Sequence, residues 1–173
     1  MMKMQNILLV DGYNMIGAWK ELRPLRDENL EDARDRLVEL MAEYKAVKGW
    51  RVIVVFDAYF VPGTEQLYIT HDVEVIYTRK NETADERIEK LSAELRGRKT
   101  QIHVATSDMT EQNVVFGHGA LRISARELEI ELDIIQSNIS QKVKATQAEK
   151  PSKRIEMSDE VRLQLEKMRR GLK

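Results

Sequence analysis

The sequence predicts an α/β protein in which a mostly parallel sheet is covered by helices on both faces. Short apolar runs rich in β-branched residues alternate along the chain with longer segments of helical periodicity, as expected when crossover helices connect the strands. The strand candidates are apolar throughout, which indicates strands that are buried on both faces. At 173 residues the chain is long enough for one such domain with a small appendage.

Five strands are expected, each formed by an apolar run between charged or turn-forming residues. In chain order they cover residues 6–10, 51–56, 73–78, 101–106 and a short segment at 120–123. The carboxyl ends of parallel strands lie along one edge of a sheet, which is where ligands bind in such folds. Residues that directly follow these strands are therefore the first candidates for a functional site.

Four helices are expected from the 3.6-residue apolar period and from capping signals at their ends. The first covers residues 30–47 and ends at Gly49. Capping boxes, Thr83 with Glu86 and Ser124 with Glu127, begin the second and third helices, which end near residues 95 and 143. The last helix covers residues 158–170 and follows the segment "AEKPSK". These elements predict a domain over residues 1–146, followed by a basic linker and a short C-terminal helix over residues 147–173.

The composition excludes several classes of site. The chain has no cysteine, which excludes disulfides, thiolate metal sites and cysteine nucleophiles. No apolar run approaches the roughly 18 residues that a membrane span needs, and no signal peptide is recognisable, so we expect a cytoplasmic protein with no membrane partner. Residues 142–173 hold ten Lys or Arg and five Asp or Glu, against 18 and 24 in residues 1–141. Such a basic tail can attract phosphate, although a solvated helical face has the same composition.

Three of the predicted strands end on an aspartate. Asp11 follows the first strand in "ILLVDGYN", Asp57 the second in "VIVVFDAY", and Asp108 the fourth in "IHVATSDM". Each alone is equally well explained by a turn or a helix N-cap, but a parallel sheet gathers all three at one edge. Clustered carboxylates repel one another, so some must either take up protons or hold a metal ion. Their oxygen ligands suit Mg²⁺ or Mn²⁺.

The residues around these aspartates resemble a known family. "DGYN" after the first strand, "VVFDA" after the second, "NETADERIEKL" at the start of a helix and "VATSD" after the fourth strand have the order and spacing of the NYN domain. This domain is a branch of the PIN-like metal-dependent ribonucleases. The resemblance covers about residues 5–145, and "NETADE" with "SARELE" indicates the YacP-like group, the bacterial ribosome-associated endoribonucleases. It implies a three-layer α/β/α PIN-like fold with a C-terminal helical tail.

The resemblance also implies the roles of individual residues. Asp11, Asp85 and Asp108 match the acidic residues that bind the metal ion. Asn14 matches the asparagine that steers the water or the scissile phosphate. Asp57 is expected either to bind the ion or to orient its waters. Asp85 also lies where the dipole of a helix favours any acidic residue, and the residue before Asp108 is not acidic as it is in some relatives, which leaves the number of metal ions open.

The activity implied by the resemblance is hydrolysis of RNA phosphodiester bonds by a metal-activated water, with mRNA as the substrate and the ribosome as a partner. No side chain has to act as the nucleophile, which agrees with the absence of cysteine. Basic residues near the expected cleft and in the tail favour RNA over a small substrate. They are Arg79, Lys80, Arg122, Arg126, Lys142 and Lys144.

Aromatic residues near the strand ends and a histidine within a strand each allow two interpretations. Tyr13, Trp19, Tyr59 and Phe60 can stack on bases, although packing within the protein is the commoner role of such residues. His103 lies inside the strand at residues 101–106 and is interpreted as a core residue rather than a ligand.

Other functions place acidic residues at strand ends too. A phosphorelay receiver needs a lysine after its last strand, where this chain has Arg122. A nucleotide-binding P-loop needs a GxxxxGK segment, which is absent, so no nucleotide cofactor is expected. A magnesium-dependent phosphohydrolase of small substrates would use the same carboxylates. A non-catalytic RNA- or ribosome-binding module would keep the fold without needing the ligand set.

Overall fold

The computed structural model describes residues 4–58, 66–107 and 119–156, and for residues 66–68 and 144–156 it describes the backbone alone. The chain forms two compact units, Met1–Ile135 and Gln136–Lys173. The first unit holds the sheet. The described part of the second unit is the continuation of the last helix. Tyr59, Phe60 and Asp108 lie outside the described residues, so their predicted roles stay predictions.

The first unit is built on a six-stranded sheet with the strand order β3-β4-β2-β1-β5-β6. All neighbours pair in parallel except β3 and β4, which are antiparallel. The five strands predicted from the sequence are confirmed, and each end lies within one residue of the expected position. They are β1 (Gln5–Asp11), β2 (Arg51–Phe56), β4 (Val73–Tyr77), β5 (Thr100–Ala105) and β6 (Leu121–Ile123).

A further strand, β3 (Gln66–Thr70), is not evident from the sequence. It is joined to β4 by His71 and Asp72, which both have left-handed backbone angles, with φ of 52° and 70°. Turns of this kind usually contain glycine or asparagine, so the sequence carries no recognisable turn signal here. β3 is also an edge strand with an exposed Ile69, and a short edge strand needs no apolar period.

The predicted capping residues form the expected bonds in three helices. α3 (Leu30–Lys48) ends at Gly49, whose φ of 72° is the left-handed conformation that glycine adopts most easily. α4 (Ala84–Leu95) and α6 (Ala125–Glu156) both begin with the predicted capping box. In each, the hydroxyl before the helix accepts a 3.1 Å hydrogen bond from the backbone N–H three residues later.

Two short helices are additions to the prediction, and one helix is longer than predicted. α1 (Gly12–Ala18) and α2 (Leu22–Glu28) have seven residues each and no side-chain cap, so neither has a recognisable apolar period. α6 continues past residue 143 and through Pro151, because the residues at 145–150 are mostly Ala, Gln, Glu and Lys, which favour helix. The predicted division between residues 146 and 147 stays a prediction.

Among the described residues, no helix combines the length and the apolar character that crossing a membrane requires.

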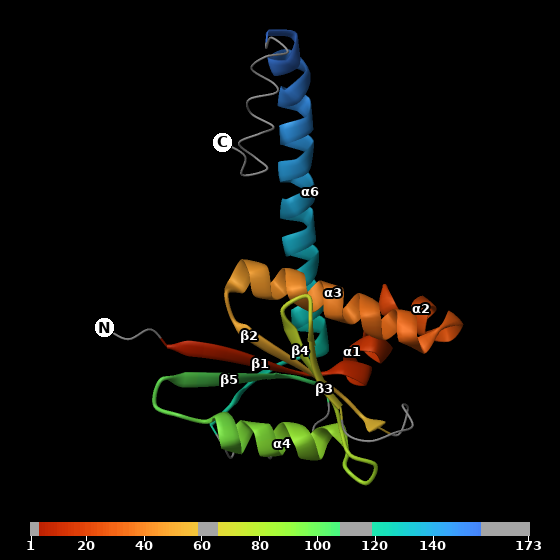
Figure 1. Ribbon diagram of the computed structural model, residues 1–173, viewed down its shortest axis with the longest axis vertical. Coiled ribbons are helices and arrows are strands. Elements are labelled where there is room, and N and C mark those ends of the chain that lie inside the picture. Colours follow the sequence, from red (N-terminus) through yellow and green to blue (C-terminus); the bar gives the residue numbers. More distant parts are fainter. Residues whose placement is uncertain (1–3, 59–65, 108–118, 157–173) are drawn as a thin grey trace. The chain divides into compact units, whose positions relative to one another are not determined.

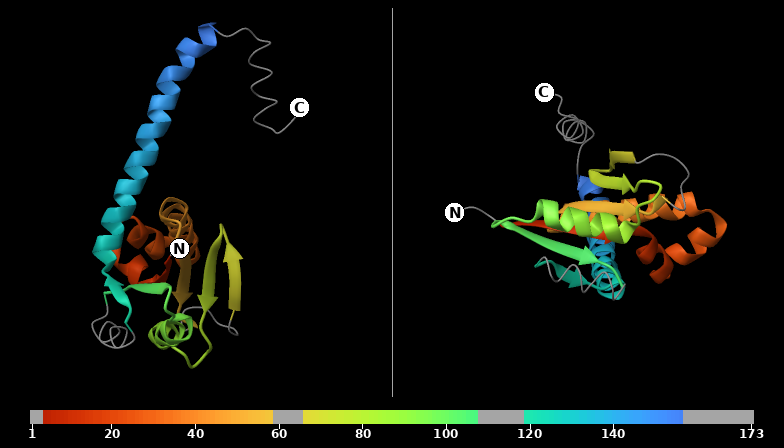
Figure 2. Two further views of the ribbon diagram at one scale, coloured as in Figure 1. Left: turned by 90° about the vertical axis from the view of Figure 1, so that its left-hand side faces the viewer. Right: turned by 90° about the horizontal axis from the view of Figure 1, so that it is seen from below.

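Helices cover both faces of the sheet, with α3 on one face and α4 on the other (Figure 1). Alternate residues of β1 belong to two cores: Leu8 and Val10 pack on the α3 side, and Ile7 and Leu9 pack on the α4 side. The first turns of α6 lie beside α1 (Figure 2), where the Trp19 indole N–H donates a 2.8 Å hydrogen bond to the Ala125 carbonyl. The predicted three-layer arrangement with a mostly parallel sheet is confirmed.

Candidate active site

The carboxyl ends of the parallel strands meet at one edge of the sheet. Asp11, the last residue of β1, pairs with Val55 of β2, so Asp57 follows two residues later at the same edge. Val10 pairs with Ala105, the last residue of β5, and the end of β4 pairs with the last residue of β2. Two of the predicted strand-end aspartates therefore lie at the same edge. The third follows β5 and lies outside the described residues.

Asp11 is a buried carboxylate, with 8% of its surface exposed, at the point where β1 turns directly into α1. That direct turn depends on Gly12. A Cβ atom at this position would lie 2.3 Å from Cε1 of Phe56 and 3.1 Å from the Val55 carbonyl oxygen. The glycine of "DGYN" thus lets the end of β2 approach the start of α1. As a result, Asn14 follows Asp11 within the first turn of the helix.

Asn14 joins the start of α1 to the end of β5. Its side-chain Oδ1 accepts a 3.0 Å hydrogen bond from the backbone N–H of Ser107, which is 93 residues later in the chain. An amide whose oxygen is used in this way keeps its two N–H donors for a water or a phosphate oxygen. The same bond holds the residue that precedes Asp108 beside α1. The structure therefore brings Asn14 to the segment that carries one of the predicted metal ligands.

Asp85 lies in the first turn of α4 and, in the sequence, between the two members of a largely buried ion pair. The Glu82 carboxylate accepts a 2.9 Å hydrogen bond from Nε of Arg87, and Nη2 of Arg87 lies 2.7 Å from the same oxygen in an ion pair. Burial raises the pKa of Glu82, but hydrogen bonds from Arg87 and from the Arg79 backbone, together with the charges of Arg87 and Lys90, hold the pKa below its ordinary value. Because one partner precedes Asp85 and the other follows it, the pair stabilises the connection from β4 into α4. This pair is not evident from the sequence, where its only signal is an acid and an arginine five residues apart in "NETADER".

Thr78 links the segment after β2 to the segment before α4. Its side chain is buried, and its hydroxyl accepts a 2.9 Å hydrogen bond from the Ala58 N–H and donates a 2.8 Å bond to the Glu82 carbonyl. Ala58 follows Asp57, and Glu82 precedes Asp85 by three residues. One threonine thus limits the separation of the two segments that carry these aspartates. A threonine at a strand end is too common for the sequence alone to indicate this role.

The described donors at this edge are oxygen atoms of carboxylates and of one amide, which are the ligands that Mg²⁺ and Mn²⁺ prefer. Within the described ranges, no three His, Asp or Glu side chains lie close enough together to hold a metal ion. The chemistry of the donors fits the ion, and the family resemblance implies one further carboxylate. Asp108 is the predicted one, so the metal site stays a prediction. The described donors are Asp11, Asn14, Asp57 and Asp85.

The basic residues predicted to contact RNA are exposed wherever their side chains are described. Two lie in the loop before α4, one lies in β6, one lies in the first turn of α6, and one belongs to the second unit. Exposure is required for phosphate contacts, and the RNA contacts of these residues stay predictions. The exposed residues are Arg79, Lys80, Arg122, Arg126 and Lys142, whereas the Lys144 side chain is outside the described residues.

His103 and Trp19 have the packing roles that the sequence favours. The His103 ring stacks on Trp50, with centroids 4.2 Å apart, and its Nε2 lies 3.0 Å from Oδ1 of Asn6. Burial lowers the pKa of His103, which favours the neutral ring. His103 pairs with Leu8 in the middle of β1, away from the carboxyl edge. Trp19 is buried in the core on the α3 side.

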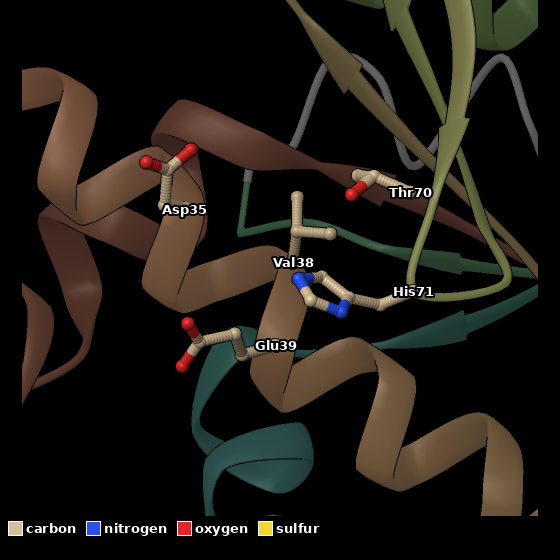
Figure 3. A pocket seen from close by; sticks show the side chains of 5 residues that line it. All are labelled: Asp35, Val38, Glu39, Thr70 and His71. Atoms are coloured by element: carbon tan, nitrogen blue, oxygen red, sulfur yellow. The ribbon is translucent and has the colours of Figure 1, made fainter.

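A cavity of about 290 Å³ lies at the opposite end of β4 from this edge. It is lined by Asp35, Val38 and Glu39 of α3 and by Thr70 and His71 at the β3–β4 turn (Figure 3). None of the predicted site residues that the structure describes lines it. Its carboxylates and histidine do not form a metal-binding group. The cavity is therefore separate from the candidate active site.

The chain matches the family model of the YacP-like NYN domain over residues 8–170. It belongs to this family. A relative from Bacillus subtilis (strain 168), named "Uncharacterized protein YacP", is 56% identical over 166 residues, which are 96% of this chain and 98% of the relative. The crystal structure of Rae1 (YacP) from Bacillus subtilis is 56% identical and has a TM-score of 0.74 over 95% of each chain. A single-residue variant of Rae1 is 54% identical, with a TM-score of 0.75 over 84% of this chain and 86% of the variant.

Membership of the YacP-like NYN family confirms the resemblance based on the four sequence segments. The similarity to the Rae1 structures confirms the PIN-like fold. Together they assign this chain a nuclease-type function that is related to RNA.

Proposed function

We propose that this YacP-like NYN protein is a metal-dependent endoribonuclease that cleaves RNA phosphodiester bonds with a metal-activated water. The observation that carries the proposal is the 3.0 Å hydrogen bond between Asn14 and the Ser107 N–H. It joins the strand end that carries Asp11 to the segment that leads to Asp108. This supports a single site at the ends of β1 and β5. The NYN family supports a nuclease reaction at that site.

Each residue at this edge would have a distinct role in the reaction. Asp11, Asp85 and Asp108 would hold Mg²⁺ or Mn²⁺, and Asp57 would act either as a further ligand or as the group that orients the ion's waters. When bound, the ion would supply an activated water and offset the negative charge that develops on the phosphate. The two amide N–H groups of Asn14 would donate hydrogen bonds to the water or to a phosphate oxygen. The burial of Asp11 would restrict its access to bulk water.

Cleavage of RNA by the purified protein should require Mg²⁺ or Mn²⁺ and should stop in excess EDTA. The reason is that the proposed site consists of carboxylates and an amide, and the chain has no cysteine to act as a nucleophile. An end-labelled RNA, incubated over a metal titration and resolved on a gel, measures this directly. Adding Mn²⁺ after chelation should restore cleavage.

Undiminished cleavage in excess EDTA would contradict the metal-dependent mechanism. RNA binding without cleavage in either metal would instead favour a non-catalytic RNA- or ribosome-binding module on the same fold. Hydrolysis of a small phosphomonoester, but not of RNA, would favour a phosphohydrolase of small substrates.

We further propose that the substrate is mRNA and that the protein acts on it in the cytoplasm in association with the ribosome. The basic tail would contribute affinity for the ribosome or for structured RNA. Residues 142–173 hold ten basic and five acidic residues, and this excess of positive charge attracts phosphate. Lys142 is exposed on α6, and Lys144 follows it in the sequence. No metal-ligand pattern occurs in this part of the sequence, which supports a role in binding rather than in catalysis.

Deleting residues 147–173 should weaken binding to ribosomes and flatten its dependence on salt, while cleavage of a short RNA at saturating concentration persists. Each lost phosphate contact should reduce the log-log salt slope by roughly 0.7–0.9. Ribosome co-sedimentation over a range of salt concentrations measures the slope, and thermal melting serves as the control. Unchanged binding together with a large drop in melting temperature would show that the tail stabilises the fold instead.

A further inference from the structure

Four arginines of the described chain are buried or partly buried, and Arg34 differs from the other three in the kind of partner to which it donates. Arg36, Arg51 and Arg87 each donate hydrogen bonds to a glutamate carboxylate, with shortest distances of 2.7 Å. Arg34 on α3 instead donates from Nη1 to the phenol oxygen of Tyr13, at 3.3 Å. Among the described residues, no carboxylate forms an ion pair with it. A guanidinium has five N–H donors, so this single bond leaves most of its donors and all of its charge for a ligand.

The Arg34 guanidinium lies at the edge of the candidate active site, because Tyr13 is part of that edge. Tyr13 follows Asp11 by two residues, and its ring centroid lies 5.1 Å from that of Phe56, which directly precedes Asp57. Phe56 in turn stacks on Tyr77 at the end of β4, with centroids 5.4 Å apart and an interplanar angle of 27°.

The electrostatics of Tyr13 agree with this placement. Burial raises the pKa of the Tyr13 phenol, the Arg34 hydrogen bond and charge lower it, and the negative charge of Asp57 raises it. The phenol therefore interacts both with the Arg34 cation and with the carboxylate side of the edge. Because the acidic edge repels the phosphates of RNA, a cation held next to it would offset part of that repulsion.

We propose that Arg34, held in orientation by the Tyr13 hydroxyl, binds an RNA backbone phosphate that neighbours the cleaved phosphodiester bond. The inference rests on the proposed nuclease function and specifies how the same site recognises its substrate. The planar guanidinium suits the tetrahedral oxygens of a phosphodiester group, to which it donates two parallel hydrogen bonds. The bond to Tyr13 reduces the freedom that the arginine would lose on binding. The aromatic row formed by Tyr13, Phe56 and Tyr77 stiffens the support beneath it.

RNA binding by the full-length chain in EDTA, where no cleavage is expected, tests this site. The probe is a short, fluorescently labelled single-stranded RNA, followed by anisotropy over a range of salt concentrations. The Arg34→Gln variant should bind at least about tenfold more weakly than wild type, and its salt slope should be smaller by roughly 0.7. Arg34→Lys should keep the slope and recover part of the affinity, since it keeps the charge but loses the paired donors. Tyr13→Phe should weaken binding less than Arg34→Gln does.

The matched control is Arg36→Gln. Arg36 lies on the same helix, and its loss changes the net charge equally, but its donors are bound to Glu21 and Glu39. This control should bind RNA within about twofold of wild type, because the Arg36 charge is already paired with two carboxylates within the protein. Equal effects of Arg34→Gln and Arg36→Gln, including no effect of either, would overturn the proposal. So would a lower melting temperature for Arg34→Gln with unchanged RNA binding, which would show that Arg34 only supports Tyr13.

The binding experiment separates this inference from the nuclease proposal. If wild type binds RNA through Arg34 but cleaves no RNA in Mg²⁺ or Mn²⁺, the nuclease proposal fails and the phosphate contact stands. If wild type cleaves RNA and Arg34→Gln both binds and cleaves as wild type does, the phosphate contact fails and the nuclease proposal stands.

Discussion

Replacing Asp11 with asparagine should reduce RNA cleavage by at least about 100-fold while the protein stays folded. Residues that only orient metal ligands contribute about 10- to 100-fold to metal affinity or activity, so the loss of a direct ligand should exceed that range. Asparagine keeps the size of the side chain but removes the charge from a buried position near Asp57. The melting temperature should therefore be unchanged or slightly higher, because like-charge repulsion decreases. Cleavage rates at saturating Mn²⁺, together with thermal melting, measure both effects.

Asp133→Asn provides the control for the loss of one negative charge. Asp133 is exposed on α6 and belongs to the first unit, remote in sequence from every predicted ligand. Its replacement should leave the cleavage rate unchanged.

Asp85→Asn should lose activity as Asp11→Asn does, since both are assigned to the same ion. Wild-type turnover by folded Asp11→Asn would remove this residue from the site and, with it, the proposed mechanism.

Replacing Gly12 with alanine should lower the free energy of unfolding by about 1–3 kcal/mol, which is the usual cost of forcing extra atoms into a packed core. The new Cβ would lie 2.3 Å from Cε1 and 2.5 Å from Cδ1 of Phe56, a ring that is fully buried. Phe56 also contacts the rings of Tyr13 and Tyr77, so it has little room to move. Chemical denaturation of the variant and of wild type measures the change in stability.

The same helix offers a matched control in Gly17. A Cβ at Gly17 would meet only Nη1 of Arg26, at 3.6 Å, which is ordinary van der Waals contact. Because alanine favours a helix over glycine by about 1 kcal/mol, Gly17→Ala should be neutral or stabilising. Shortening Phe56 to leucine should recover part of the stability lost in Gly12→Ala, beyond the effect of Phe56→Leu alone. Equal stability changes at both glycines would contradict the proposed close approach of β2 to α1.

By itself the sequence determined the elements whose signals are local. The apolar runs of five strands, the capping boxes of α4 and α6 and the glycine that ends α3 all lie within or next to the element that they specify. The alternation of strands and helices also determined a mostly parallel sheet, and that topology placed Asp11 and Asp57 at one edge. The four sequence segments were sufficient to identify the YacP-like NYN family, because they carry the residues at the strand ends.

Only the tertiary structure decided which distant residues meet. Asn14 and Ser107 are 93 residues apart in the sequence and come together because β1 and β5 are neighbours in the sheet. The apolar period of a strand specifies which face is buried, but it does not specify which strand lies next to it. The β3–β4 turn is held in an unusual backbone conformation with help from Lys45, whose Nζ donates a 2.6 Å hydrogen bond to the Asp72 carbonyl.

The position of Arg34 at the candidate active site was also decided only by the tertiary structure. It reaches Tyr13 because α1 and α2 pack against α3, and two seven-residue helices carry too few residues to show a period in the sequence. The carboxylates of the site could therefore be predicted from where strands end. The contact between Arg34 and Tyr13 could not, because it depends on how three helices pack.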